Sequence, residues 1–189
     1  MSQNSCQGND ELCLEDLLEW YSGNTSLFHY ACGKGYLKVV KELIECKLDI
    51  NVFDENDYTP LHWAARNGHF EILRLLLANG SEIDINGGMY GKTSLMIAAS
   101  LGIKEIVKIL IEFGADITMV SEKDQNRNSL HLAAINGKDE IVELLIDNGI
   151  NIDTIDNQNN SPLHLAANKG HASTANLLIM KGGELELQH

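Results

Sequence analysis

Four histidines recur at the same place in a repeated segment, and imidazole is the commonest side-chain ligand of metals. They are His29, His62, His131 and His164. Equivalent positions on successive packed helices lie roughly 8–10 Å apart, whereas a bond between zinc and an imidazole nitrogen is about 2 Å long. One ion cannot reach two of these side chains. We therefore predict no metal site, and expect each histidine to join its own helix to the adjoining loop through hydrogen bonds.

A second candidate is the segment from Asn86 to Thr93, which nearly matches the phosphate-binding pattern G-x-x-x-x-G-K-[ST]. Asn86 stands where the pattern requires its first glycine. A phosphate loop also belongs to a βαβ unit, for which the sequence shows no pattern. The repeat described below accounts separately for Gly91 as a turn residue and for Thr93 as a helix cap. Nucleotide binding through Gly87–Thr93 stays as the least favoured alternative.

A thiol and an imidazole, Cys32 and His29, lie close together in the sequence and could in principle form a nucleophile and base. No orienting carboxylate or oxyanion donor accompanies them. The four cysteines, Cys6, Cys13, Cys32 and Cys46, show no C-x-x-C spacing, and Cys32 stands where other repeats have alanine. We expect reduced cysteines, with Cys32 as a small buried residue. We predict no catalytic residue, no cofactor and no enzymatic activity.

The histidines belong to a segment that occurs five times and ends each time at a glycine. The five glycines are Gly35, Gly68, Gly102, Gly137 and Gly170, in steps of 33, 34, 35 and 33 residues. Self-similarity at this period indicates a solenoid. Because one short unit cannot bury its own apolar face, its stability has to come from stacking on its neighbours.

The second copy shows how one unit is built. Thr59 is a good N-cap, and Pro60 occupies the first helical position, where its missing N–H is no loss. Gly68 ends this short helix. A second helix follows with apolar residues from Ile72 to Leu77, and Gly80 ends it in the same way. The unit is therefore helix, turn, helix and protruding loop.

These segments resemble the ankyrin repeat. The family's T-P-L-H-x-A-A-x-x-G-H segment stands at Thr59–His69 without a mismatch and at Ser161–His171 with Ser for Thr. Its G-A-D segment is present at Gly114–Asp116. The resemblance implies an all-α ankyrin-repeat solenoid of five helix-turn-helix repeats with hairpin-like loops, at about 23–52, 56–85, 90–119, 125–154 and 158–187. It also implies a curved stack whose concave face and loop tips bind other proteins.

Three features depart from the family pattern. Met96 replaces the histidine, so the third repeat should lack one hydrogen bond from helix to loop. Lys47 replaces a helix-ending glycine, which predicts a small strain if the backbone there is left-handed. The loops that enter the third and fourth repeats are one and two residues longer than the others.

The two ends of the array are expected to act as caps. Residues 1–10 read as a mobile tail, and residues 11–22 as a capping helix with Leu12, Leu14, Leu17, Leu18 and Tyr21 on its apolar side. A partner-recruiting helix is the alternative for this segment. At the other end of the array, which spans 23–189, Ser173, Thr174 and Asn176 predict a final helix that faces water. We expect the array to be complete at five repeats.

The composition limits the classes of partner. The chain has 14 Lys and Arg against 27 Asp and Glu, a net charge of −13. This balance argues against a nucleic-acid partner, which requires a basic surface, and is compatible with a basic protein partner. Neither a signal peptide nor a run of membrane-spanning length is visible. We expect a monomer that does not associate with membranes and is located in the cytoplasm or nucleus.

Positions that differ among the copies and face solvent are free to carry binding specificity. These are the loop tips and the two residues before each first-helix glycine. Trp63 lies at a register held elsewhere by leucine, so burial explains it. The sequence predicts a protein-binding surface on repeats two to four, formed by Tyr58, Arg66, Asn67, Met89, Tyr90, Lys92, Leu101, Arg127, Ile135 and Asn136. The alternative is a structural repeat protein without a single partner.

Overall fold

The computed structural model describes residues 27–186. Its helices are α2 (Leu27–Lys34), α3 (Leu37–Glu45), α4 (Pro60–Asn67), α5 (Phe70–Ala78), α6 (Ser94–Leu101), α7 (Lys104–Glu112), α8 (Ser129–Ile135), α9 (Asp139–Asp147), α10 (Pro162–Asn168) and α11 (Ala172–Glu186). A 3-10 helix, η1 (Glu122–Asp124), lies in the loop before α8. Within these residues the only extended pairings are two isolated bridges, Gly87 with Lys92 and Ser121 with Arg127.

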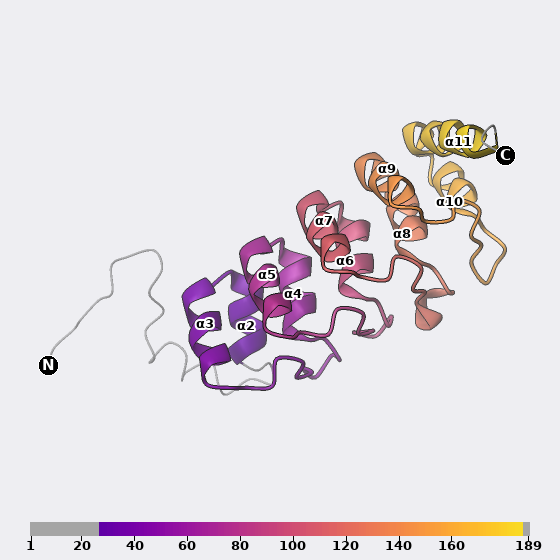
Figure 1. The fold of residues 1–189 in the computed structure, drawn as a ribbon. Helices are drawn as coiled ribbons and strands as arrows, with labels where there is room; N and C mark the ends of the chain where they lie inside the picture. The colour runs from indigo at the N-terminus through magenta and orange to yellow at the C-terminus, as the bar shows by residue number, and fades with distance from the viewer. Residues whose placement is uncertain (1–26, 187–189) are drawn as a thin grey trace, which may run out of the picture.

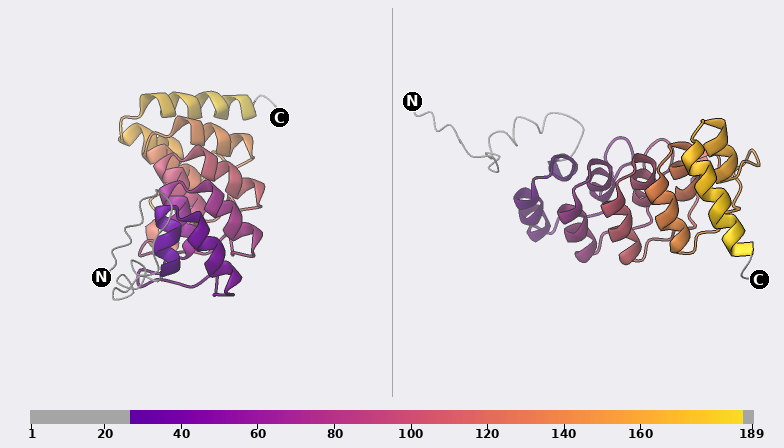
Figure 2. Two further views of the ribbon diagram at one scale, coloured as in Figure 1. Left: turned by 90° about the vertical axis from the view of Figure 1, so that its left-hand side faces the viewer. Right: turned by 90° about the horizontal axis from the view of Figure 1, so that it is seen from above.

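The ten helices of the described residues form five pairs in contact, and the pairs stack into an elongated array (Figure 1). The first helices, α2, α4, α6, α8 and α10, make one row, and the second helices, α3, α5, α7, α9 and α11, make the other. Two further views show the same succession of pairs from one end to the other (Figure 2). The main contacts join each helix to its own partner and to its counterpart in the adjacent repeat. The predicted all-α solenoid of five repeats is confirmed.

In the second repeat the helices begin at the predicted cap residues and end at the predicted glycines. In the second repeat Thr59 is extended, Pro60 opens α4, and the Thr59 and His62 side chains form a reciprocal capping box. Gly68 follows α4 with φ 77°, a left-handed conformation that favours glycine. Gly80 has φ 88° after α5. The predicted caps and stops are confirmed.

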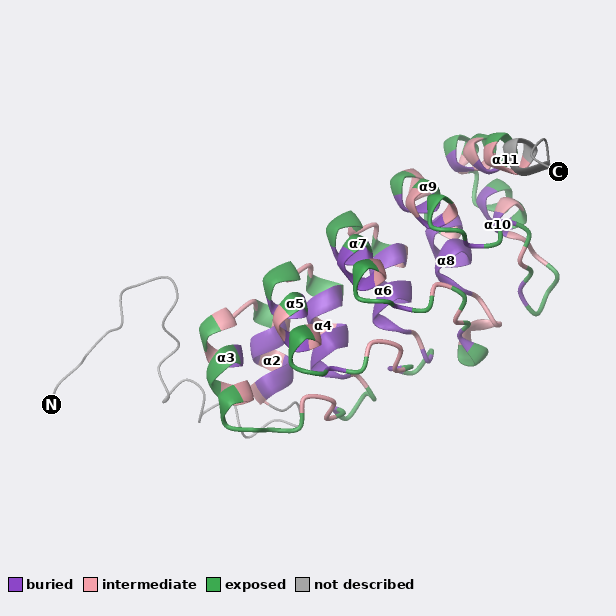
Figure 3. Ribbon diagram, in the orientation of Figure 1, coloured by how far each residue is buried: buried purple, intermediate pink, exposed green. Residues whose placement is uncertain are grey.

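The buried residues form one continuous core along the stack (Figure 3). In the first helices, pairs of small residues such as Ala64 and Ala65 are fully buried, which lets neighbouring helices approach closely. In the second helices the apolar side is buried and the opposite side is exposed. Cys32 is fully buried, as predicted.

The predicted departures are present, with one correction. Lys47 adopts φ 57°, so a non-glycine residue does occupy the left-handed turn. Met96 is buried, and the Thr93 hydroxyl caps its backbone N–H. The prediction that Thr174 faces water is wrong, because its side chain is buried and its hydroxyl donates to Asp139 of the preceding repeat. Ser173 is exposed, and its hydroxyl also donates to Asp139.

The predicted capping helix at 11–22 and the predicted tail at 1–10 lie outside the described residues. The same holds for Cys6 and Cys13. Among the helices that the structure describes, none has both the length and the apolar character needed to cross a membrane.

Candidate partner-binding surface

The four long loops between repeats lie along one side of the array and form what we call the loop edge (Figure 1). It comprises residues 46–59, 79–93, 113–128 and 148–161. Each loop is bonded to the next. The Gly88 N–H donates to the Asp57 carbonyl (3.0 Å), the Ser121 hydroxyl donates to the Tyr90 carbonyl, and the Asn157 N–H donates to the Gln125 carbonyl (2.9 Å). The tips are therefore held in a fixed order.

Two of the recurring histidines, His29 and His62, anchor the loop edge. Nδ1 of His62 accepts the Thr59 N–H at 3.1 Å, so Nε2 carries the hydrogen. That group donates to the carbonyls of Ile85 (3.1 Å) and Lys92 (3.0 Å). His29 Nε2 contacts the Val52 carbonyl in the same manner at 3.0 Å. The predicted role in joining helix to loop is confirmed for His29 and His62. It does not hold for His131, whose buried Nε2 makes no hydrogen bond within the described residues. The hydrogen bonds of His164 are to Ser161, at the start of its own helix.

Burial lowers the pKa of three of the recurring histidines, His29, His62 and His131, and so sets their protonation state. Desolvation lowers the pKa of His62 to about 4, although the Lys92 and Ile85 carbonyls oppose the shift. Burial also lowers the pKa of His29 and of His131. These imidazoles are thus neutral at pH 7. In the part of the chain that the structure describes, no three His, Cys, Asp or Glu side chains are arranged to hold a metal ion.

Two buried carboxylates, which the sequence analysis missed, fold the loop tips. One Asp54 oxygen accepts the N–H groups of Asn56 and Tyr58 (2.9 Å each), and the other accepts Nε1 of Trp63 (2.8 Å). Asp156 stands at the equivalent position of a later loop. A repeated aspartate directly before the tip was the available signal, because aspartate readily accepts hydrogen bonds from the N–H groups that follow it.

Asp156 repeats this arrangement and adds an ion pair. Its side chain accepts the N–H groups of Gln158 and Asn160 (2.9 Å each) and Nε of Arg127 (3.1 Å). Burial alone would raise the pKa of Asp156, but these hydrogen bonds lower it below its ordinary value. Asp156 therefore remains ionised inside the loop.

The predicted binding residues divide by exposure. Met89, Tyr90 and Leu101 are exposed by 73%, 51% and 48%. Arg66, Asn67 and Asn136 are also exposed, whereas Tyr58, Lys92, Arg127 and Ile135 are partly buried. The predicted residues therefore do not contribute equally to the accessible surface.

The structure arranges the predicted residues in two rows. Tyr58, Met89, Tyr90, Lys92 and Arg127 lie on the loop edge, which enters the first helices at their N-terminal ends. Arg66, Asn67, Leu101, Ile135 and Asn136 lie at the C-terminal ends of α4, α6 and α8. These helices have seven or eight residues, which at 1.5 Å per residue separates the rows by about 11–12 Å.

The partly buried cations hold the loops together. Lys92 Nζ lies 2.9 Å from Asp124 of the next loop and 5.2 Å from the centre of the Tyr90 ring. Arg127 pairs with Asp156 and also lies 3.5 Å from Asp124. Tyr58 packs against Gly88, where any added Cβ would come within 2.3 Å of the ring. These three side chains position the loop edge.

The segment that resembles a phosphate loop is a tight hairpin. Gly87 and Lys92 exchange backbone hydrogen bonds of 2.9 and 2.8 Å, and the N–H groups of Gly88 and Gly91 donate to other backbone carbonyls. A phosphate loop requires free N–H groups that point at its ligand. Since these four are already bonded to carbonyls and Lys92 is paired with Asp124, the geometry disfavours nucleotide binding here.

Acidic side chains are concentrated on the loop edge. Its four loops contain eleven Asp and Glu residues and four Lys and Arg residues. Their net charge is therefore −7, more than half of the −13 of the whole chain. The loop edge combines a negative potential with the exposed side chains of Met89 and Tyr90.

The pairing of short helices recurs throughout the described array, and a glycine with positive φ follows each first helix. The family model for ankyrin repeats (3 copies) matches residues 3–87, 28–121 and 95–189. The chain belongs to the ankyrin repeat family. Ankyrin repeats generally mediate protein–protein interaction and are typically non-catalytic.

Several curated proteins are similar to parts of this ankyrin-repeat chain. Palmitoyltransferase AKR1 of Kluyveromyces lactis is 32% identical over 106 residues, which cover 52% of this chain and 14% of that protein. Ankyrin repeat and KH domain-containing protein mask-1 of Caenorhabditis elegans is 38% identical over 82 residues, covering 43% and 3%. Mouse ankyrin repeat and SAM domain-containing protein 6 is 36% identical over 91 residues, covering 48% and 10%. The chain thus spans only a small part of each relative, and the palmitoyltransferases match only through their ankyrin regions.

Proposed function

We propose that this chain is a non-catalytic protein-binding module that contacts its partner through the concave face and loop tips of repeats two to four. The observation that carries the proposal is the exposure of Met89, Tyr90 and Leu101 in the middle of the array. Exposed apolar side chains that lie together in a patch are typical of interaction sites, and Met89 and Tyr90 are neighbours at one loop tip. Aromatic, Met and Arg side chains are also the usual anchors of interfaces.

The order of the loop tips supports the proposed binding of a partner through them. The hydrogen bonds from loop to loop, together with the histidine and aspartate anchors, fix the tips before any partner arrives. A surface that is already ordered loses little conformational entropy on association. Lys92, Arg127 and Tyr58 contribute to this order, and Arg66, Met89, Tyr90 and Leu101 supply accessible contact area.

The charge of the loop edge suggests the chemistry of the partner. Eleven acidic residues against four basic ones repel a nucleic acid and attract a basic protein surface. We therefore propose a protein partner whose contact surface carries Lys or Arg beside an apolar residue. We further propose that the chain acts as a monomer in the cytoplasm or nucleus.

The test compares two triple variants by affinity capture from native lysate. The loop variant carries Arg66→Ala, Met89→Ala and Tyr90→Ala. The control carries Arg74→Ala, Phe70→Ala and Ile179→Ala, which removes one exposed Arg and two exposed apolar side chains from the second helices α5 and α11. We expect a protein that wild type and control retain and that the loop variant loses at least tenfold.

Stability measurements make this test decisive. Removing exposed side chains normally changes the free energy of unfolding by less than about 0.5 kcal/mol. A large loss in the loop variant would show that its residues belong to the core. Identical capture by all three proteins would overturn the proposed surface and favour the alternative of a structural protein without a single partner. Calorimetric titration with ATP or GTP and magnesium tests the remaining alternative at Gly87–Thr93.

A further inference from the structure

The two loops that follow α7 and α9 border a pocket on the loop edge. It measures about 210 Å³, whereas sites for drug-sized ligands measure roughly 300–1,000 Å³. Its apolar wall includes Val120, Ile150 and Ile155. Val120 and Ile155 are exposed by 39% and 58%, so the wall is open to an incoming group. A pocket of this size suits a single side chain.

His131, which also lines this pocket, carries its ring hydrogen on a different nitrogen from His62. The backbone N–H of His131 donates to Oδ1 of Asn128 (3.1 Å), which identifies that atom as the amide oxygen. The same oxygen lies 2.7 Å from Nδ1 of His131, and the Asn128 N–H is farther from Nδ1, at 3.4 Å. Because an amide oxygen can only accept, Nδ1 carries the hydrogen. In His62, by contrast, Nδ1 accepts from Thr59 and Nε2 donates to the loop.

This tautomer leaves acceptors at the pocket wall without a donor. Nε2 of His131 is buried and makes no hydrogen bond within the described residues, although the Thr154 carbonyl lies beside the ring. Val52 is the counterpart of Thr154 in the first loop, and its carbonyl contacts Nε2 of His29 at 3.0 Å. The Thr154 carbonyl therefore lacks the imidazole donor that its counterpart has. Unsatisfied acceptors favour a ligand that donates hydrogen bonds.

The charge around the pocket favours a cationic donor. No Lys or Arg is among the residues that line it. The Asp116 carboxylate accepts the hydroxyl of the lining residue Thr118 (2.6 Å), so a negative charge is bonded to the wall. Asp153, next to Thr154, is also exposed. A lysine side chain combines an apolar stem with a compact ammonium group that has three donors.

We propose that this pocket receives a lysine side chain of the partner protein, with its stem on Val120 and Ile155 and its ammonium group directed to the acceptors beside Thr154. The proposal rests on the proposed function and names a site at which a Lys of a basic partner is recognised. This site lies between the fourth and fifth repeats and adjoins the surface on repeats two to four.

The experiment titrates the full chain with Nα-acetyl-lysine N-methylamide and follows the backbone amide and His131 ring nitrogen signals by NMR. The matched ligand is the norleucine counterpart, which has the same stem without the ammonium group. We expect saturable shifts around the pocket and binding of the lysine probe at least about tenfold tighter than that of the norleucine probe. The ring signals should place the His131 hydrogen on Nδ1.

Two pairs of variants test the acceptors and the wall separately. Asn128→Thr copies Thr59, and both residue types are good N-caps, so the fold should be retained. The new hydroxyl should move the hydrogen to Nε2, which then donates to the Thr154 carbonyl, and should weaken the lysine probe at least about fivefold. Thr59→Ser, which keeps the hydroxyl in the second repeat, is its control. Ile155→Ala should also weaken the probe, whereas Phe53→Ala, at the same register of the first loop and equally exposed, should not.

Three outcomes would overturn the proposal. No saturable shift, or equal binding of both probes, would show that the ammonium group is not recognised. A hydrogen on Nε2 of His131 in wild type would remove the unsatisfied acceptors. Unchanged binding by Asn128→Thr, once its hydrogen has moved to Nε2, would show that these acceptors do not hold the ligand. Because the probe replaces the partner, none of these results decides the capture experiment, which tests the proposed function separately.

Discussion

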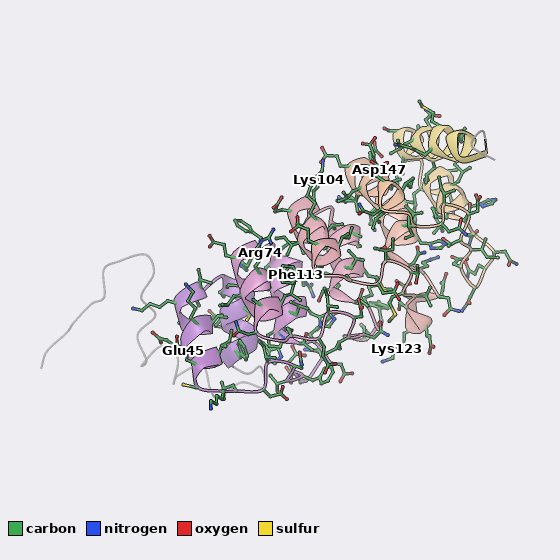
Figure 4. All side chains as sticks on the ribbon, in the orientation of Figure 1. Glu45, Arg74, Lys104, Phe113, Lys123 and Asp147 are labelled. Carbon is green, nitrogen blue, oxygen red and sulfur yellow. The ribbon has the colours of Figure 1, made fainter. Side chains whose placement is uncertain are left out.

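Ion pairs between adjacent repeats link both sides of the array, but those on the second-helix side are exposed and those on the loop edge are enclosed. On the second-helix side, ion pairs link Arg74 to Glu112 (2.9 Å) and Lys104 to Glu140 (3.1 Å), with side chains exposed by 45–74%. Figure 4 labels Arg74 and Lys104 on this side. On the loop edge, Arg127 and Asp156 pair at 3.1 Å with exposures of 13% and 0%.

This difference in exposure indicates which interactions stabilise each side of the array. Exposed ion pairs contribute little, because water and salt screen them, so the second helices depend mainly on their buried apolar side. The loops have few buried apolar residues and depend on enclosed, hydrogen-bonded carboxylates such as Asp54 and Asp156. Enclosed polar groups become costly once a partner is removed. The loop edge should therefore be the side that responds to pH and to single polar substitutions.

The largest expected effect is a loss of stability in acid. The pKa of His62 is about 4 in the folded chain and about 6.5 when unfolded. Below pH 6.5 the unfolded chain takes up the proton first, so stability present above pH 6.5 is lost as the pH falls towards 4. The difference corresponds to about 3 kcal/mol at pH 4, and His29 and His131 act in the same direction. Urea unfolding at pH 7, 5.5 and 4 measures it.

A variant that copies the third repeat provides the control. His62→Met places methionine where Met96 stands in that repeat. We expect this variant to lose about 1–2 kcal/mol at pH 7 and to show a weaker pH dependence than wild type. If the free energy of unfolding of the variant falls with pH as steeply as that of wild type, His62 is not a source of the acid sensitivity.

A smaller effect distinguishes the two sets of ion pairs. Arg127→Ala leaves the enclosed Asp156 carboxylate without its cation, although the Gln158 and Asn160 N–H groups remain. We expect a loss of about 1–3 kcal/mol. Arg74→Ala, the control on the second-helix side, should cost less than about 1 kcal/mol. Equal losses in urea unfolding would contradict the distinction between the two sides.

The smallest expected effect is a gain in stability from a substitution in the turn that ends α3. Lys47 has φ 57°, whereas Gly80, Gly114 and Gly149 occupy the equivalent turns with φ of 87–88°. Lys47→Gly should raise the free energy of unfolding by about 0.5–1 kcal/mol, because glycine adopts this conformation without a steric penalty. Gly114→Ala is the reciprocal control, since its Cβ would meet nothing within 4 Å. A loss in Lys47→Gly would show that the left-handed turn is not strained.

The repeat architecture could be predicted because local and repeated signals agree. Thr59, Pro60 and Gly68 act within their own helix, and the fivefold recurrence removes the ambiguity of any one segment. Thr174 was mispredicted because a polar residue in the last repeat suggests exposure, whereas its hydroxyl bonds to Asp139 of another repeat. Contacts between repeats do not appear in the pattern of a single repeat.

The candidate surface was less predictable for the same reason. The sequence could indicate that Met89 and Tyr90 stand at a tip, and the structure shows both exposed. It could not indicate that Arg127 pairs with Asp156, 29 residues later. It also left unassigned the contact of His69 with the Gly33 carbonyl of the preceding repeat (3.0 Å). Such pairings depend on the register between stacked repeats.

Because its main contacts join only adjacent repeats, the array should respond to a pulling force one repeat at a time. The main helix contacts link each repeat only to the next, so tension applied to the two ends passes through every repeat in series. A terminal repeat can detach without breaking the contacts among the others. Each detached unit of 33 residues releases about 110 Å of chain. Stretched from its ends, the protein would lengthen in discrete steps and could shorten again by restacking on the repeats that remain.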